Sequence, residues 1–133
     1  MPPNEAWSSE AHRWFRYAEE DLAAAHLMLT SLQVFPKQAC YHAQQAAEKA
    51  LKSVLVAHGI PFPRTHDLLA LARLLPQDDA PLIAGLDLGD LSTWAVTARY
   101  PMDPEEATTT EAHGAVIMAE LLCERIHRRM PTL

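Results

Sequence analysis

Residues 40–52 read Cys40-Tyr41-His42-Ala43-Gln44-Gln45-Ala46-Ala47-Glu48-Lys49-Ala50-Leu51-Lys52, and this stretch decides the fold. No glycine or proline interrupts the sequence from Lys37 to His58, and most residues there have high helix propensity. Small apolar side chains recur at helical spacing, namely Ala39, Ala43, Ala46, Ala47, Ala50, Val54 and Leu55. Because small side chains let a neighbouring helix approach closely, we predict a central helix over residues 37–58.

Helical patterns flank this segment on both sides. On the N-terminal side, Pro36 separates it from a predicted helix over residues 8–32, with an inward stripe of Trp14, Ala18, Leu22, Ala25, Leu29 and Leu32. On the C-terminal side, Gly59 ends the central helix, and Pro61 and Pro63 prevent its continuation. A short helix should follow Thr65, whose hydroxyl can cap it while Leu68, Leu71, Ala72 and Leu75 pack inward.

The C-terminal half contains two more predicted helices. Residues 76–89 are rich in Asp, Pro and Gly and read as a loop with room for one helical turn. A helix is expected over residues 90–99, and Pro101 limits it. We expect Asp103 to be the N-cap of the last helix, with Pro104 in its first turn. The inward stripe of this helix is Ala112, Ala115, Ala119, Leu122 and Ile126.

These patterns predict one all-α domain over residues 1–133, an antiparallel helical bundle of about four long helices plus one short helix. Apolar residues make up 49% of the chain and only four glycines are present, as expected of a helical, globular protein. The net charge of −6 provides no global basic field, so nucleic-acid binding would depend on local clusters. No signal peptide or membrane span is recognisable, and Cys40 and Cys123 have no Cys-x-x-Cys partner, so a cytoplasmic location with reduced thiols is expected.

Four polar side chains on the predicted central helix form the first candidate ligand site. His42, Gln45, Lys49 and Lys52 are three or four residues apart and therefore share a helical surface. Their donors, acceptors and positive charges can hold a phosphate and a base. The alternative is a solvated helix face on which Glu48 and Lys52 form an i,i+4 pair.

Arg99-Tyr100-Pro101 forms the second candidate site. An arginine at a helix end, held beside a proline corner, can bind a phosphate through two guanidinium N–H groups at once. It can equally cap the free carbonyls of the helix or pair with Asp103. The spacing alone does not choose between these roles.

Metal and cofactor chemistry finds no support in the motifs. The seven histidines include no His-Glu-x-x-His, and Glu124-x-x-His127 is a solitary motif where a di-iron bundle needs two. There is no glycine-rich phosphate loop and no Gly-x-Ser-x-Gly, so we expect no bound metal and no cofactor. The basic clusters Arg13/Arg16 and Arg125/Arg128/Arg129 read as solvent-exposed or dipole-compensating charges.

The order of these segments resembles the HEPN domain family. Trp14 followed by residues 18–22 (Ala-Glu-Glu-Asp-Leu), the run at residues 40–52, Thr65-His66-Asp67-Leu68 and Ala98-Arg99-Tyr100-Pro101 all occur in the family's order. The resemblance covers about residues 7–126, nearly the whole chain. It implies a helical bundle that commonly forms homodimers and is often paired with a minimal nucleotidyltransferase in toxin–antitoxin systems.

The resemblance also implies two kinds of activity. Many members are metal-independent ribonucleases that use an arginine and a histidine, separated by four to six residues, across a dimer cleft; others only bind nucleotides. No histidine of this chain follows an arginine at that spacing. Of the family's catalytic residues, the resemblance therefore assigns only Arg99 in this chain, with the adjacent Tyr100 as a weaker candidate. His66 can enter the cleft from another segment.

The sequence and the resemblance give three functional hypotheses. The first is a nucleotide- or RNA-binding HEPN module that works with a nucleotidyltransferase partner. The second is a metal-independent endoribonuclease whose histidine comes from elsewhere in the fold. The third is a purely structural dimerisation module. The sequence alone leaves open whether the protein is an enzyme.

Overall fold

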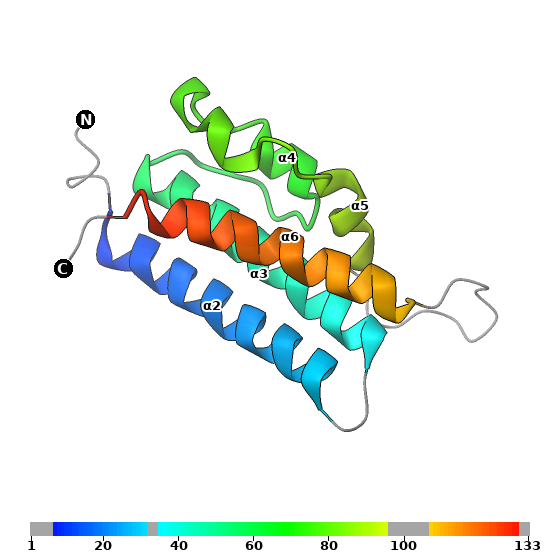
Figure 1. Ribbon diagram of the computed structural model, residues 1–133. Coiled ribbons are helices and arrows are strands. Elements are labelled where there is room, and N and C mark those ends of the chain that lie inside the picture. Colours follow the sequence, from blue (N-terminus) through cyan, green and yellow to red (C-terminus); the bar gives the residue numbers. More distant parts are fainter. Residues whose placement is uncertain (1–6, 32–34, 96–106, 131–133) are drawn as a thin grey trace.

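The computed structural model describes residues 7–31, 35–95 and 107–130, and these ranges contain helices and no strand. The all-helical fold class is confirmed. Three long helices dominate the described chain, namely α2 (Ser9–Thr30), α3 (Pro36–Ala57) and α6 (Thr109–His127). Helices α2 and α3 form an antiparallel pair, and α6 runs antiparallel to α2 and in the same sense as α3 (Figure 1). None of the helices in these ranges is both long and apolar enough to cross a membrane.

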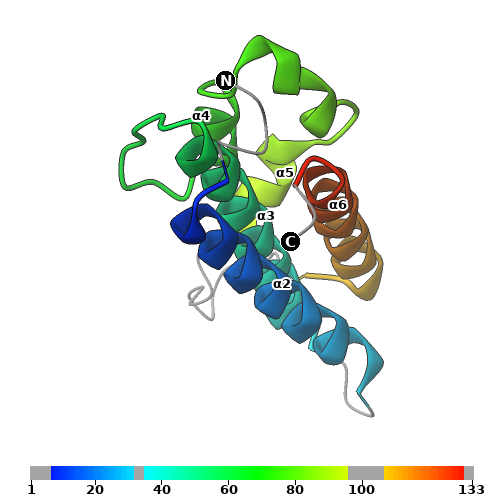
Figure 2. The same cartoon turned by 90° about the vertical axis from the view of Figure 1, so that its left-hand side faces the viewer.

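Helix α3 is the centre of the bundle, as its alanine pattern predicts. It packs against both α2 and α6, and Figure 2 shows it between them. Its five predicted alanines are completely buried, which lets both neighbours approach the α3 backbone. The helix begins at Pro36 rather than after it, because a proline in the first turn lacks only an N–H that the helix does not use. Gly59, with φ of +67°, follows the C-terminal end.

Short helices form a cap on the side of α3 and α6 that faces away from α2 (Figure 1). They are α4 (Leu68–Ala72), the 3-10 helix η1 (Gln77–Ile83), α5 (Leu88–Ser92) and the 3-10 helix η2 (Thr93–Ala95). The predicted loop over residues 76–89 therefore contains η1. The predicted helix over residues 90–99 starts earlier, because the Asp87 carboxylate accepts from the Asp90 N–H as an N-cap. Its part beyond residue 95 lies outside the described residues.

The buried stripe of α2 is rotated from the predicted one. Its buried residues are Ala11, Phe15, Ala18, Ala25 and Leu29. Trp14 and Leu22, which were expected in the stripe, are only half-buried. Trp14 packs edge-on against Phe62, and Leu22 lines a surface groove beside α6, so both lie at the margins of the helix contacts. Leu32 lies outside the described residues.

The prediction that Asp103 caps the last helix is wrong, since α6 begins at Thr109 with Thr108 as its N-cap. The Thr108 hydroxyl accepts from the Glu111 N–H, and the Glu111 carboxylate accepts from the Thr108 N–H, each at 3.0 Å. This capping box satisfies two free N–H groups reciprocally. Asp103 itself lies outside the described residues. The predicted inward stripe is confirmed, because all five of its residues are buried.

Basic residues at the end of α6 bind the cap of short helices instead of remaining in solvent. Arg125 donates from its guanidinium to the carbonyls of Leu82, at 3.2 Å, and Ala84, at 2.8 Å. Arg129 forms an ion pair with the buried carboxylate of Asp79. These contacts fix η1 against the C-terminal end of α6.

Candidate functional site

Polar side chains of α3 are buried between helices rather than displayed on an open face. Gln44, Gln45, Glu48 and Lys52 are 0%, 9%, 4% and 9% exposed. The expected i,i+4 pair of Glu48 and Lys52 exists, with Oε2 and Nζ 2.9 Å apart, but neither residue is solvated. Since buried polar groups are costly unless they are paired, the partners of these four residues define the site.

Glu48 lies at the centre of this network. Its Oε1 is 2.8 Å from Nδ1 of His66, and its Oε2 accepts from Lys52. A carboxylate paired with an ammonium group acts only as an acceptor, so Nδ1 of His66 carries the proton. Nε2 of the same ring has no partner among the residues that the structure describes. The Glu48 side chain is 5% exposed, whereas that of His66 is 68% exposed. The buried Glu48 carboxylate therefore orients the His66 imidazole, most of which lies in solvent.

The backbone of His66 is fixed as firmly as its ring. Nε2 of Gln44 donates to the His66 carbonyl at 2.9 Å, and the Ser92 hydroxyl donates to the same oxygen at 3.2 Å. Gln45 in turn donates to Oε1 of Gln44 at 2.7 Å, and the Leu68 N–H donates to the Ser92 hydroxyl at 2.9 Å. The position of His66 is thus set by α3 and α5 together.

The segment around His66 also starts helix α4. The N-cap is Asp67, whose carboxylate accepts from the Leu69 N–H at 3.0 Å. Thr65, the expected cap, accepts from the Asp67 N–H at 3.0 Å and so orders the turn before the helix. A carboxylate two residues nearer the helix captures the free N–H groups better than the Thr65 hydroxyl.

A second carboxylate repeats the pattern on the same side of α3. Asp21 of α2 accepts from Lys49, and its Oδ1 is 3.0 Å from Nδ1 of His42. The side chains of Asp21, His42 and Lys49 are 14%, 26% and 27% exposed. The predicted site residues therefore fall into two groups. One gathers at Asp21 (His42 and Lys49), and the other at Glu48 (Gln45 through Gln44, Lys52 and His66).

Arg99 and Tyr100, the remaining predicted site residues, lie outside the described residues. The sequence interpretation missed the roles of Gln44, Glu48 and Ser92, which hold His66. A signal was available for the first two. Gln44, Glu48 and Lys52 are spaced by four along the helix and flank its alanine face, and a polar row beside buried side chains needs partners elsewhere in the fold.

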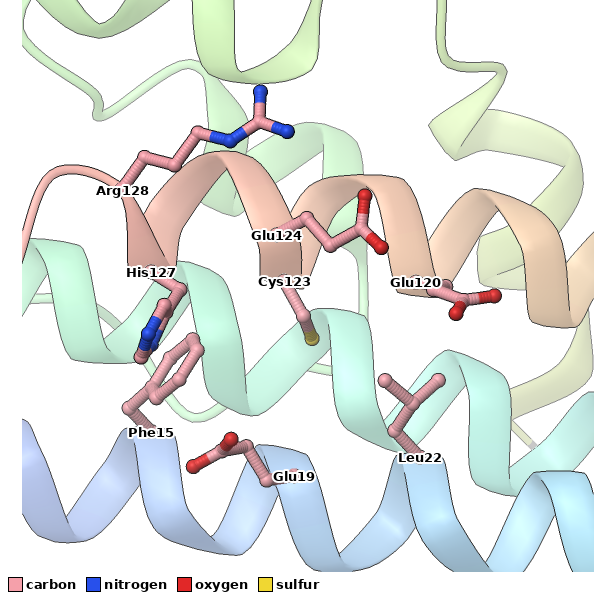
Figure 3. A pocket seen from close by; sticks show the side chains of 8 residues that line it. All are labelled: Phe15, Glu19, Leu22, Glu120, Cys123, Glu124, His127 and Arg128. Carbon is pink, nitrogen blue, oxygen red and sulfur yellow. The ribbon is translucent and has the colours of Figure 1, made fainter.

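A groove on the described surface, between α2 and α6, is chemically different (Figure 3). It has a volume of about 300 Å³ and is lined by Phe15, Glu19, Leu22, Glu120, Cys123, Glu124, His127 and Arg128. Burial, together with Glu19, Glu120 and Glu124, raises the pKa of Cys123 to about 12. Three carboxylates at one groove repel a phosphate, and the thiol is protonated and unreactive at neutral pH. Within the described ranges, no group of three His, Cys, Asp or Glu residues is arranged to hold a metal ion.

Comparison with known proteins identifies the family. The sequence profile described as "HEPN domain" matches residues 11–129, most of the chain. The chain belongs to the HEPN domain family. Membership of this family supports a nucleotide- or RNA-related module in general terms. The Glu48–His66 arrangement joins two of the segments that carried the resemblance, the run at residues 40–52 and residues 65–68.

A solved structure has the same HEPN fold. The crystal structure of TT1696 from Thermus thermophilus superimposes with a TM-score of 0.76 at 28% sequence identity, covering 92% of this chain and 100% of that chain. No curated protein matches this sequence.

Proposed function

We propose that this HEPN domain binds the phosphate of a nucleotide or an RNA strand through His66, working with a minimal nucleotidyltransferase partner in a toxin–antitoxin-like pair. One observation carries the proposal. The His66 ring is 68% exposed, yet it is oriented by a carboxylate that is 5% exposed. A surface histidine held in this way is prepared for a ligand, because its orientation costs no further entropy on binding.

The charges of the site favour an anionic ligand. Lys52 neutralises Glu48 inside the fold, so a protonated His66 adds a net positive charge at the surface. Its Nε2–H can then donate to a phosphate oxygen in a charge-assisted hydrogen bond. Arg99 is proposed as the second phosphate contact, since it belongs to a segment shared with the family and follows Ser92 closely in sequence.

The first test is a binding assay with His66→Ala and Arg99→Ala. Each variant should bind ATP and mixed RNA about tenfold more weakly, which is the value of one charge-assisted phosphate contact. The fold should be kept in His66→Ala, because the His66 side chain is largely in solvent and the Glu48 carboxylate retains its ion pair with Lys52. His113→Ala, an exposed histidine on α6, is the matched control. Normal binding by both folded variants would contradict the proposal.

A second candidate function, metal-independent RNA cleavage, is favoured by the free Nε2 of His66. In the neutral ring this nitrogen has a lone pair and can take the proton of a ribose 2′-hydroxyl, as a general base does. The 2′-oxygen then attacks phosphorus, the bond to the 5′-oxygen breaks, and that oxygen takes a proton. Incubating mixed RNA with the protein in EDTA tests this function. Cleavage that disappears in His66→Ala and Arg99→Ala would support it, and intact RNA would contradict it.

The homodimer and a purely structural role belong to the same set of proposals. Light scattering coupled to gel filtration will give the oligomeric state of the wild type. If Lys49 lies at a dimer interface, Lys49→Glu will change the oligomeric state. The binding proposal predicts no such change. Lys49 is preferred to Lys52 because its side chain is 27% exposed, whereas that of Lys52 is 11% exposed and paired with the more deeply buried Glu48.

A further inference from the structure

A small hollow lies on α2 close to the Glu48–His66 pair. It has a volume of about 260 Å³ and is lined by Glu10, Arg13, Trp14 and Tyr17. These residues occupy positions i, i+3, i+4 and i+7 and so form one stripe on the helix. The volume is below the roughly 300–1,000 Å³ of pockets for drug-sized ligands, and it suits a single planar ring.

Aromatic and cationic groups come together at this hollow. Arg16 lies over the Tyr17 ring, with its guanidinium carbon 5.5 Å from the ring centroid. Neither Arg13 nor Arg16 makes an ion pair with another described residue. In a chain with a net charge of −6, Arg13 and Arg16 outnumber the Glu10 carboxylate at this hollow, so two cations beside two aromatic rings give it a local positive charge. The opposite sign prevails in the α2–α6 groove of Figure 3, where three glutamates gather.

Contacts connect the hollow to the candidate site. The Trp14 ring packs edge-on against Phe62, with centroids 6.3 Å apart, so its orientation is fixed. Lys52 Nζ lies 5.5 Å from the Trp14 centroid and 2.9 Å from the Glu48 carboxylate, which holds His66. The hollow and the Glu48–His66 pair are therefore linked through Lys52, which contacts both Trp14 and Glu48.

We infer that the Arg13–Trp14–Tyr17 hollow takes one unstacked nucleobase of a single-stranded RNA whose phosphate contacts His66. The inference rests on the proposed function and identifies the ligand as a strand. Aromatic rings stack on any base, and neighbouring cations follow the phosphates, which is how single strands are bound without a sequence code. The Glu10 carboxylate can accept from the exocyclic amino group of a base.

The test measures binding of a fluorescein-labelled, ten-nucleotide 2′-O-methyl RNA by fluorescence anisotropy at low salt, since this backbone resists cleavage. Tyr17→Leu should weaken binding about tenfold, the value of one base–aromatic stack. Tyr17 is 41% exposed, so this variant keeps the fold even if Trp14→Leu does not. Phe35→Leu is the matched control, because Phe35 is 42% exposed and lies at the far end of the α2–α3 pair.

A second oligonucleotide with the same phosphates but abasic positions separates base stacking from backbone binding. It should bind weakly to the wild type, and Tyr17→Leu should cause no further loss. An equal loss for intact and abasic strands would overturn the inference. Normal binding by Tyr17→Leu, with loss in His66→Ala, would overturn the inference and keep the proposed function. A wild type that binds neither nucleotide nor strand would overturn both.

Discussion

The Glu48 carboxylate, buried between helices, holds the imidazole of His66, which lies mostly in solvent, through a hydrogen bond of 2.8 Å. The pair joins the interior of the bundle to its surface. Its buried end must be neutralised for the fold to be stable, and its exposed end is free to meet a ligand. Substitutions of Glu48 should therefore change the stability of the fold, and substitutions of His66 should change ligand binding.

Removing the charge of Glu48 should destabilise the fold. In Glu48→Gln the Lys52 ammonium, 11% exposed, loses its anionic partner, and the free energy of unfolding should fall by about 3 kcal/mol. Urea denaturation followed by circular dichroism measures this change. Glu20→Gln, on the exposed face of α2, should change stability by less than about 0.5 kcal/mol.

The double variant Glu48→Gln/Lys52→Met isolates the interaction. Because neither buried charge is left alone, its loss of stability should be smaller than the sum of the two single losses. Strict additivity would show that the two side chains stabilise the fold independently and that the pair is not the centre of the network.

The contact between Arg129 and Asp79 should stabilise the cap. The Asp79 side chain is 7% exposed and is also 2.9 Å from Nε2 of His58, so Arg129→Ala leaves a buried carboxylate with one partner. We expect a loss of about 1–2 kcal/mol, measured by thermal unfolding. Arg128→Ala is the matched control, since Arg128 is exposed and forms no ion pair within the described chain. Equal effects of the two variants would contradict a specific role for Arg129.

The capping box at the start of α6 gives a further prediction. Thr108→Ala removes the acceptor of the Glu111 N–H and should lower the free energy of unfolding by about 1 kcal/mol. Thr110→Ala, two residues along and also exposed, should have little effect. If the two variants unfold at the same denaturant concentration, α6 does not depend on this cap.

Alkaline stability should depend on Cys123. Burial, aided by three glutamates, raises the pKa of this thiol from 9.0 to about 12. Above pH 9 the unfolded chain loses the thiol proton while the folded chain keeps it. The free energy of unfolding therefore falls as pH rises from 9 towards 12, by at most about 1.4 kcal/mol per pH unit, and is unaffected below pH 9. Cys123→Ala should show a shallower decline across that window.

Thiol labelling checks the same property directly. In a Cys40→Ala background, iodoacetamide at pH 8 should modify folded Cys123 far more slowly than the urea-unfolded chain, because the thiolate is the reactive form. Rapid labelling of the folded protein would show that the groove between α2 and α6 leaves the sulfur accessible and ionised.

The sequence by itself determined the helical class and the centre of the bundle. Alanines at three-and-four spacing over residues 39–50 leave a helix with one narrow face, and only close helix neighbours on that face can bury it. The end of the central helix at Gly59, Pro61 and Pro63 was also predictable from local sequence, since it follows from the backbone conformations available to those residues. The order of four segments, Trp14 with residues 18–22, residues 40–52, residues 65–68 and residues 98–101, also indicated the family.

Only the tertiary structure decided what the polar residues of α3 do. Periodicity places His42, Gln45, Lys49 and Lys52 on one surface, but the same spacing describes a solvated face and a buried one. Which it is depends on the acids that other segments bring, and Asp21 lies 21 residues before His42. His66 reaches Glu48 across 18 residues of sequence. Hydrogen bonds over such separations are set by helix packing, because the pairing energy of two side chains depends on a distance that no local pattern encodes.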